Sequence, residues 1–287
     1  MSASPAELIL TMDAIGTVPS SVTQIFSLIN DPKTCANDFE RVVRPDVGLT
    51  ANLLRCANSV FYRATREITS VRDAINRMGL RRVFEVAASS SFAQAIPKKL
   101  TGYGLTAQDY WDHSVAVAVL ADRIGREAGF TYPDLAFTSG LLHDLGKVVV
   151  ALFLATTPES EWPQEHLRTV EDESSLLGTD HCELGELLAV KWNLPKEICG
   201  AARWHHQPDS APTATLRYLA TVVQVADGAA HVSAGAGNGD ASEPLAPDAL
   251  ERLNLEPERV MDIVAVAKAE IDRTAEMLRG AMGRRAA

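Results

Sequence analysis

The sequence predicts an all-α protein. Apolar residues recur every three to four positions in most segments, proline and glycine separate these segments, and no segment shows the strict alternation of a half-buried strand. The chain has 287 residues, more than one hydrophobic core comfortably supports, so we expect two helical subdomains. We place them at residues 1–100 and 101–232, followed by a flexible linker or loop at 233–248 and C-terminal helices at 249–287.

The composition is that of an ordinary globular protein, with 46% apolar and 22% charged residues. A net charge of −10 argues against a protein that coats DNA or RNA, because such a protein needs a basic face. No apolar run approaches the ~20 residues of a membrane helix, and no basic region precedes the short apolar run near the N-terminus. None of the four cysteines forms a CxxC motif. We therefore expect a soluble cytoplasmic protein that binds neither nucleic acid nor membrane.

The N-terminal half reads as a series of short helices. In residues 18–30, Ser21 and Gln24 have the spacing of a capping box. Further helices are predicted at residues 38–44, 46–61, 68–78 and 80–96. Asn58 and Ser59 are the polar residues that stand out in this half. They could line a groove for a partner or ligand, but we favour a local role in which Asn58 caps its helix and Ser59 bonds the backbone.

The C-terminal half begins with a connector. Residues 97–106 combine proline, two glycines and two lysines without apolar periodicity, and a longer helix follows from 107 to about 129. Residues 156–175 are polar, carry two prolines and read as a crossing loop, and 233–247 are a low-complexity segment. Further helices are predicted before and through His143, and at residues 181–192, 196–206, 215–231, 247–254 and 257–280.

The stretch Gly140–Lys147, GLLHDLGK, places His143 beside Asp144 at the end of an apolar helical run. Adjacent residues cannot share a helix face, so both can bind one centre only where the helix ends. We predict that Gly146 stops the helix. Imidazole and carboxylate ligands suit a divalent transition metal or manganese better than calcium.

Further histidines and aspartates recur on or near the other predicted helices of this half: Asp109, His113, His181, His205, His206 and Asp227. A single histidine on an apolar helix face is usually a core residue with one hydrogen bond. Asp227 is harder to explain, because a carboxylate in line with leucine and valine needs a buried partner, either an arginine, a helix N-terminus or a metal. Several such faces together indicate a common metal site.

These candidates exceed what one metal ion needs. Two ions about 3.5–4 Å apart would use them all, with Asp144 as the bridge. A site of this kind activates water at neutral pH and holds a phosphoryl group, so it suggests hydrolysis of a phosphate ester. Lys147 could offer its cation to the phosphate, or it could be a solvated surface lysine. We expect one or two iron, manganese, nickel or zinc ions per chain.

The order of His113, the pair His143-Asp144 and Asp227 resembles the defining pattern of HD-domain phosphohydrolases. The full set resembles the dinuclear centre of HD-GYP cyclic-di-GMP phosphodiesterases. That resemblance implies an HD-type helical bundle in the C-terminal subdomain, with Lys147 at the lysine of the HD-x-GK motif. It implies metal ligands at Asp109, His113, His143, Asp144, His181, His205, His206 and Asp227.

The chain departs from HD-GYP after the double histidine, where it reads HHQPDSAP instead of an acidic residue and a Gly-Tyr-Pro loop. This departure argues against cyclic-di-GMP as the substrate. The N-terminal half instead resembles the HDOD family of bacterial signalling modules, in PSSVTQIFSLINDP, RPDVGLTANLLRCANSVFY and ITSVRDAINRMGLRRV. GLLHDLGK and HCELGELLAVKWNLP are also typical of that family, so the resemblance covers residues 15–230. For this family, intact ligands favour metal binding more than catalysis.

Three functions stay open on the sequence alone. The chain could be a signalling module that acts through a protein partner, with a structural or vestigial metal site. It could be an active metal-dependent phosphohydrolase for a nucleotide or cyclic dinucleotide, or a sensor that binds such a ligand without turnover. The retained ligands favour the last two functions, whereas the missing Gly-Tyr-Pro loop and the N-terminal half favour the first. We rank the signalling module first; the oligomeric state is not predicted.

Overall fold

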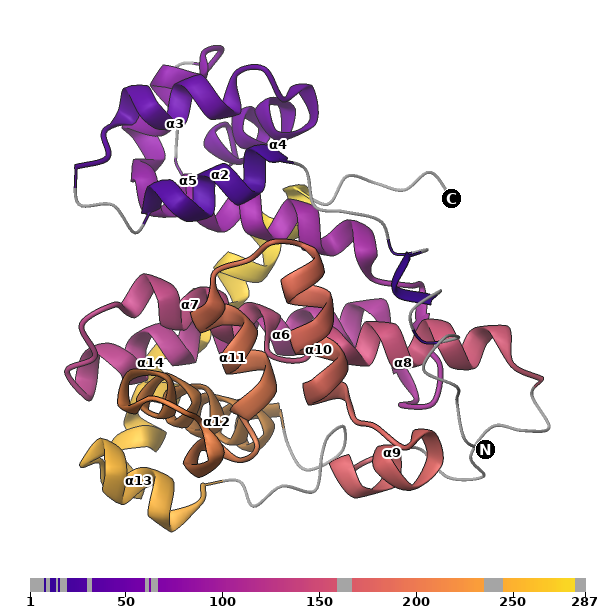
Figure 1. Cartoon of the computed structure of the whole chain (residues 1–287). Helices are drawn as coiled ribbons and strands as arrows, with labels where there is room; N and C mark the ends of the chain where they lie inside the picture. The colour runs from indigo at the N-terminus through magenta and orange to yellow at the C-terminus, as the bar shows by residue number, and fades with distance from the viewer. Residues whose placement is uncertain are drawn as a thin grey trace. The chain divides into compact units, whose positions relative to one another are not determined.

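The computed structural model describes residues 8, 11–13, 15, 20–29, 33–59, 62, 67–158, 167–234 and 245–281. Over these residues the chain is helical apart from one two-stranded hairpin, which confirms the predicted all-α class (Figure 1). The predicted linker at 233–248 falls largely on residues outside this described part.

The chain forms two compact units that are discontinuous in sequence. The first comprises Ile96–Lys191 and Lys196–Ile271 with the described residues of Met1–Gly16, and the second comprises Thr17–Ala95 with Trp192–Pro195 and the C-terminal residues from Asp272. A linear order of subdomains was predicted. The structure differs because helices far along the chain contribute to both cores, which local sequence patterns do not encode.

The N-terminal part of the second unit contributes α2 (Ser20–Ile29), α3 (Ala36–Val43), α4 (Val47–Ala57) and α5 (Val71–Ala95). Their apolar faces bury Ile25, Phe39 and Leu53 completely. The break predicted at Gly79 is present inside α5, where this glycine adopts φ 79° and ψ 159°. Ser21 does not cap α2: it lies within the helix, and its hydroxyl donates to the Asp46 carboxylate at 2.5 Å.

Asn58 has the local role that the sequence favoured. Its side-chain Oδ1 accepts from the backbone N–H of Ile68 at 2.7 Å, and its Nδ2 donates to the carbonyls of Leu54 and Ile68. The side chain thus ties the end of α4 to the segment that leads into α5. The expected backbone bond from the Ser59 hydroxyl is absent: this buried oxygen has no hydrogen-bond partner among the described residues.

The first unit opens with a hairpin that the sequence did not predict. Strands β1 (Lys99–Leu100) and β2 (Leu105–Thr106) pair antiparallel, with Leu100 opposite Leu105. Two residues per strand are too few to show an alternating pattern. Gly102 and Gly104 form the turn at positive φ, 93° and 70°, which explains the two glycines in this segment.

Helices make up the rest of the first unit: α6 (Ala107–Glu127), α7 (Pro133–Leu142), α8 (Leu145–Thr156), α9 (Val170–Leu177), α10 (His181–Lys191), α11 (Lys196–Trp204), the short 3₁₀ helix η3 (Pro208–Ser210), α12 (Ala214–Ala234), α13 (Pro247–Leu253) and α14 (Pro257–Ala281), whose residues from Asp272 belong to the second unit. Helix α9 corrects the prediction of a loop over 156–175. It begins with a capping box in which Thr169 and Asp172 bond each other's backbone N–H groups.

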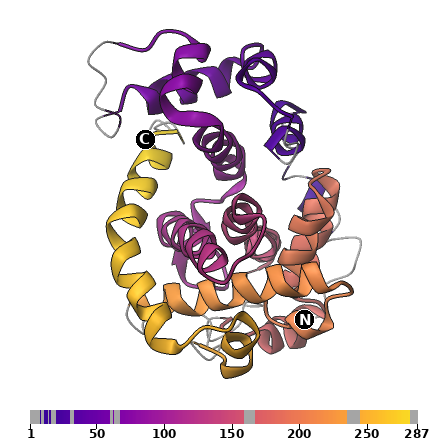
Figure 2. The same cartoon turned by 90° about the vertical axis from the view of Figure 1, so that its left-hand side faces the viewer.

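The core of this unit is built by α6, α7 and α12, which pack against one another (Figure 2). Gly140 lets α7 approach α6 closely, because a Cβ atom there would lie 2.9 Å from the carbonyl oxygen of Val117. The stretch Leu135–Thr156 is long and apolar enough to cross a membrane by length and composition. Its most apolar window is 94% buried inside the protein, so this stretch serves as core.

Candidate metal centre

Five segments of the first unit bring histidine and aspartate side chains together. Helix α6 supplies His113, the junction of α7 and α8 supplies His143 and Asp144, and the first turn of α10 supplies His181. The remaining members follow α11 or lie on α12: His205, His206, Asp227 and His231. With Cys182, these side chains form three groups, two of which share His113, and within each group the donor atoms lie within 4.8 Å of one another.

The adjacent pair His143-Asp144 faces one centre because the chain turns between two helices at this point. Helix α7 ends at Leu142 and α8 begins at Leu145, so neither residue of the pair lies inside a helix. The break therefore comes before Gly146, which was the predicted stop and instead lies in the first turn of α8. The buried Tyr110 hydroxyl donates to the backbone carbonyl of Asp144 at 3.0 Å and fixes the turn.

The two carboxylate oxygens of Asp144 face different histidines. Oδ1 lies 3.4 Å from Nε2 of His181 and 3.9 Å from Nε2 of His205. Oδ2 lies 3.4 Å from Nε2 of His143 and 4.0 Å from Nε2 of His113. Asp144 thus stands between two groups of imidazoles, in the arrangement of a bridging carboxylate.

Asp227 completes the group on the Oδ2 side. Its Oδ1 lies 3.1 Å from Nε2 of His113 and 3.8 Å from Nε2 of His143. The Oδ1 atom also lies 3.3 Å from Nε2 of His231, one turn further along α12. His231 was not singled out from the sequence. Its spacing of four residues from Asp227 was the signal, because residues i and i+4 share a helix face.

Three histidines are held with Nε2 directed into the cluster. Nδ1 of His143 lies 2.8 Å from the carbonyl oxygen of Gly140, and Nδ1 of His205 lies 2.9 Å from that of Ala202. A carbonyl oxygen only accepts, so Nδ1 carries the proton in each ring. Nδ1 of His181 likewise donates to a carboxylate, that of Glu173. When these rings are neutral, their Nε2 lone pairs point at the centre, as they do in metal sites.

Glu173 is the most extensively bonded of the supporting residues. Its buried carboxylate accepts from Nδ1 of His181 at 2.8 Å and from the backbone N–H of His181 at 2.6 Å. It also accepts from the Tyr103 hydroxyl at 2.7 Å. The sequence reading missed Glu173 because it lies on α9, in the segment predicted to be a loop.

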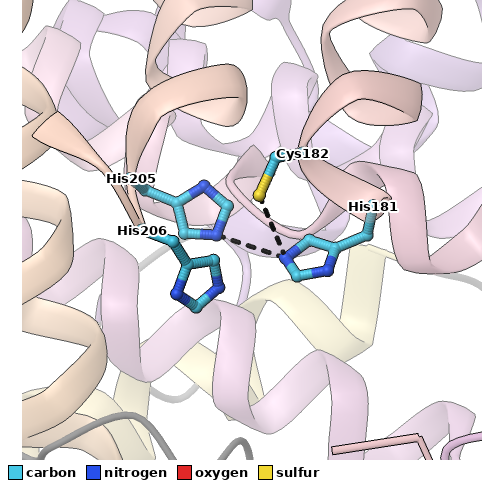
Figure 3. Close-up of side chains that lie close together, drawn as sticks. All are labelled: His181, Cys182, His205 and His206. Atoms are coloured by element: carbon cyan, nitrogen blue, oxygen red, sulfur yellow. Dashed lines mark hydrogen bonds between the residues drawn. The ribbon is translucent and has the colours of Figure 1, made fainter. Parts of the chain in front are cut away.

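His181 and His205 approach each other closely. Their Nε2 atoms are 3.4 Å apart, and the Cys182 sulfur lies 3.6 Å from the same Nε2 of His181 (Figure 3). The ring of His206 lies beside that of His205, with 4.3 Å between centroids. Two facing Nε2 lone pairs repel unless a cation or a proton lies between them.

The electrostatics keep the aspartates ionised and two of the histidines neutral. Burial would raise the pKa of Asp144, but the neighbouring His143 and the Lys147 ammonium outweigh it and hold that pKa well below its ordinary range. Burial lowers the pKa of His205 well below its ordinary value, and together with the charge of His181 it lowers the pKa of His206 to about 3. Neutral imidazoles and anionic carboxylates are the protonation states that bind metal.

Asp109 and Lys147 are the two remaining predicted site residues. Asp109 is exposed at the start of α6, where its carboxylate accepts from the backbone N–H of Thr106 at 2.9 Å and from the Thr106 hydroxyl at 2.7 Å. Although Asp109 lies one helical turn before His113, its carboxylate bonds Thr106 and is not among the clustered donor atoms. Lys147 is mostly buried, and its ammonium lies 2.9 Å from Oδ2 of Asp144. It is therefore not a solvated surface lysine.

The donors fit a transition-metal centre. Nε2 of His143, Nε2 of His231 and Oδ1 of Asp144 are buried without a hydrogen-bond partner of good geometry in the described part of the chain, as is Oδ1 of Asp227. Such atoms are uncommon in folded proteins, and a bound water or ion commonly satisfies them. Imidazole and carboxylate donors suit iron, manganese, nickel and zinc.

Sequence comparison places the chain among known proteins. The HDOD domain model matches residues 15–208. An uncharacterised protein of Treponema pallidum is 25% identical over 222 residues, covering 74% of this chain and 41% of that protein. Ribonuclease Y of Thermus thermophilus is 34% identical over 149 residues, covering 52% of this chain and 21% of that enzyme. The chain thus spans less than half the length of either relative.

Three solved structures share the architecture. An HDOD domain protein of Geobacter sulfurreducens is 25% identical with a TM-score of 0.68, and the match covers 96% of this chain and 98% of that one. A proposed signal transduction protein of Marinobacter aquaeolei is 23% identical with a TM-score of 0.76, covering 93% and 61%. A proposed metal-dependent phosphohydrolase of Shewanella amazonensis is 16% identical with a TM-score of 0.56, covering 93% and 97%. The family resemblance read from the sequence is confirmed: this chain belongs to the HDOD domain family.

Proposed function

We propose that this chain is a regulatory module of the HDOD type that binds a dinuclear transition-metal centre and acts through a protein partner. The observation that carries the metal proposal is the placement of Asp144, whose two carboxylate oxygens face two separate sets of imidazole nitrogens. A carboxylate that only balanced Lys147 would need one oxygen for that purpose. The second oxygen faces His181 and His205, away from the lysine.

Two metal positions follow from this geometry. His181, His205 and Oδ1 of Asp144 would hold one ion. Oδ2 of Asp144 would hold the other, together with His113, His143 and Asp227. His231 can bind the second ion or orient Asp227, because its Nε2 lies 3.3 Å from that carboxylate. The supporting contacts from Gly140, Ala202 and Glu173 orient the rings toward these positions.

The regulatory part of the proposal rests on family membership. The HDOD match, over residues 15–208, includes parts of both units, and a structural neighbour is itself a proposed signal transduction protein. A metal centre buried in the core stabilises the unit that contains it, because binding to the folded state alone adds to the stability of that state. The partner would then bind helical surfaces. The metal would stabilise the fold of these surfaces, or its binding and loss would change that fold.

Metal analysis of protein purified without a histidine tag tests the metal proposal. We expect about one to two equivalents of iron, manganese, nickel or zinc per chain in the wild type. Asp144→Ala should lose at least one of them, while the second unit keeps its fold because it has its own core. Wild-type protein that contains no metal and takes up neither added Mn²⁺ nor Fe²⁺ would contradict the proposal.

A metal-dependent phosphohydrolase is the second candidate, and the exposure of the cluster favours it. The side chains of His181 and His205 are 0% exposed, whereas those of His113 and His231 are 19% and 17% exposed and that of Lys147 is 11% exposed. The side chains at the position formed by His113 and Asp227 therefore reach the protein surface, although their donor atoms are buried. When bound there, a metal ion supplies Lewis-acid activation of a phosphoryl group and of water.

A screen of nucleotides, cyclic dinucleotides and short RNA with Mn²⁺ and Fe²⁺ separates the two candidates. The RNA is included because a relative of this chain is named ribonuclease Y. The regulatory module predicts the same background rate in wild type and in Asp144→Ala. Turnover in metal-loaded wild type that falls by orders of magnitude in Asp144→Ala would establish the phosphohydrolase instead.

A further inference from the structure

Cys182 lies beside the metal position formed by His181, His205 and Asp144. Its side chain is 2% exposed, and its sulfur lies 3.6 Å from Nε2 of His181. In Figure 3 the sulfur points toward the same space as the ring nitrogens of His181 and His205. A buried cysteine is often a small apolar side chain, but such a residue has no reason to face the nitrogen of a buried imidazole.

The three distances from Nε2 of His181 match the edges of a coordination tetrahedron, whereas Nε2 of His205 and Oδ1 of Asp144 lie 3.9 Å apart and would move closer on one ion. With zinc–nitrogen and zinc–oxygen bonds of about 2.0–2.1 Å and a zinc–sulfur bond of about 2.3 Å, two nitrogen or oxygen ligands lie about 3.3–3.4 Å apart and nitrogen and sulfur ligands about 3.5–3.6 Å apart. The observed separations from Nε2 of His181 are 3.4 Å to Nε2 of His205, 3.4 Å to Oδ1 of Asp144 and 3.6 Å to the sulfur of Cys182.

His206 is the rival for the fourth ligand. One of its donor atoms lies within 4.8 Å of those of His181, Cys182 and His205, and its ring centroid lies 5.2 Å from that of His181. The 3.6 Å contact from His181 to the Cys182 sulfur already equals a ligand-to-ligand edge. Cys182 and His181 therefore need no change in their separation to share one ion.

We propose that Cys182 is a metal ligand that completes a tetrahedral position with His181, His205 and Asp144, and that this position takes zinc or another thiophilic divalent metal. The inference rests on the proposed function, since it requires the metal centre. On binding, the thiol releases its proton to solvent and the thiolate donates its electron pair to the metal. The other position, at His113, His143 and Asp227, offers only nitrogen and oxygen donors and suits manganese or iron as well as zinc. The two positions of the cluster thus differ in the metal that they select.

Cobalt substitution tests the sulfur ligand directly. We expect metal-free wild type loaded with Co²⁺ to show the near-ultraviolet charge-transfer absorption of a thiolate–cobalt bond. Cys182→Ser and Cys182→Ala should both lose this band. The matched control is Cys199→Ser, because Cys199 is a second buried thiol of the same unit and is not among the clustered donor atoms. Retention of the band in both Cys182 variants, or its absence in cobalt-loaded wild type, overturns the proposal.

Zinc affinity gives a second readout that does not depend on absorption. Loss of a direct ligand should weaken zinc binding at this position at least as much as loss of an outer contact, about 10–100-fold, while Mn²⁺ binding at the other position changes little. Bound zinc should also protect Cys182 from alkylation by iodoacetamide, identified by peptide mass. Cys182→Ala guards against a folding artefact, because alanine keeps the site apolar.

These outcomes distinguish failure of the Cys182 ligand from failure of the metal centre as a whole. Wild type that binds neither Co²⁺ nor Zn²⁺ contradicts the metal centre as a whole. Wild type that binds them without a thiolate band, and with equal zinc affinity in the Cys182 variants, contradicts only the sulfur ligand and leaves His206 as the fourth donor.

Discussion

A Cβ atom on Gly146 would lie 1.8 Å from the carbonyl oxygen of His181. Glycine at this position therefore lets the first turn of α8 rest directly on the first turn of α10. The contact carries a functional consequence, because Asp144 immediately precedes α8 and His181 begins α10. The backbone approach at Gly146 is what allows Oδ1 of Asp144 to lie 3.4 Å from Nε2 of His181.

Gly146→Ala should therefore separate the two metal-binding elements. Overpacking typically costs about 1–3 kcal/mol, and the backbone contact here puts the expected loss at the upper end of that range. Zinc binding at the position of His181 and Asp144 should weaken with it. Urea unfolding and zinc titration measure the two effects. Gly48→Ala is the control, since a Cβ atom there meets only a side-chain oxygen at 3.6 Å. Equal stability and zinc affinity in the two variants would show that α8 and α10 can adjust freely.

Glu173→Gln should weaken metal binding although Glu173 contacts no metal position. Its carboxylate holds the ring of His181 through Nδ1, and an amide in its place loses the charge and one acceptor oxygen. Outer contacts of this kind are worth about 10–100-fold in metal affinity. Glu171→Gln, an exposed change on the same helix, is the control. Unchanged zinc affinity in Glu173→Gln would mean that packing alone orients His181.

Asp109→Ala and Asp144→Ala should behave differently. Loss of the capping-box contacts from Asp109 to Thr106 should cost no more stability than the loss of an N-cap residue, about 0.5–2 kcal/mol, and should leave the metal content intact. Asp144→Ala should lose metal. Elemental analysis and thermal unfolding of the two variants check this expectation. Metal loss in Asp109→Ala would restore the role that the HD-GYP resemblance implied for this residue.

The stability of the metal-free protein should fall as the pH drops below 6.5, in part because of His206. Burial lowers the pKa of His206 from an ordinary 6.5 to about 3, so between these values the unfolded chain binds a proton that the folded chain does not. The contribution of His206 is complete above pH 6.5 and decreases by about 1.4 kcal/mol per pH unit below it.

Urea unfolding in the presence of a chelator measures this dependence. His206→Asn should show a shallower loss of stability between pH 6.5 and pH 3 than wild type. The histidines with raised pKa values, His143, His181 and His231, act in the opposite direction and are present in both proteins. Parallel curves for the two proteins would show that His206 becomes protonated in the folded state.

Helical periodicity alone gave the all-α class and most helices, because an apolar stripe is a local property of the sequence. The break at Gly79 and the cap at Asn58 were also local and were predicted. The elements that the sequence missed are short or polar: the hairpin at 99–106 has two residues per strand, and α9 lies in a segment read as a loop.

The candidate site divides in the same way. The sequence named the donor types and most of the residues that meet, since histidine and aspartate on apolar faces are visible without coordinates. Only the tertiary structure decided which donors share a centre. The helix cap takes Asp109 out of the cluster, whereas the packing of α8 on α10 turns the two oxygens of Asp144 to opposite sides. Helices α10, α9 and α12 likewise bring Cys182, Glu173 and His231 to the site. These relations depend on contacts between residues far apart in the chain, which no local pattern specifies.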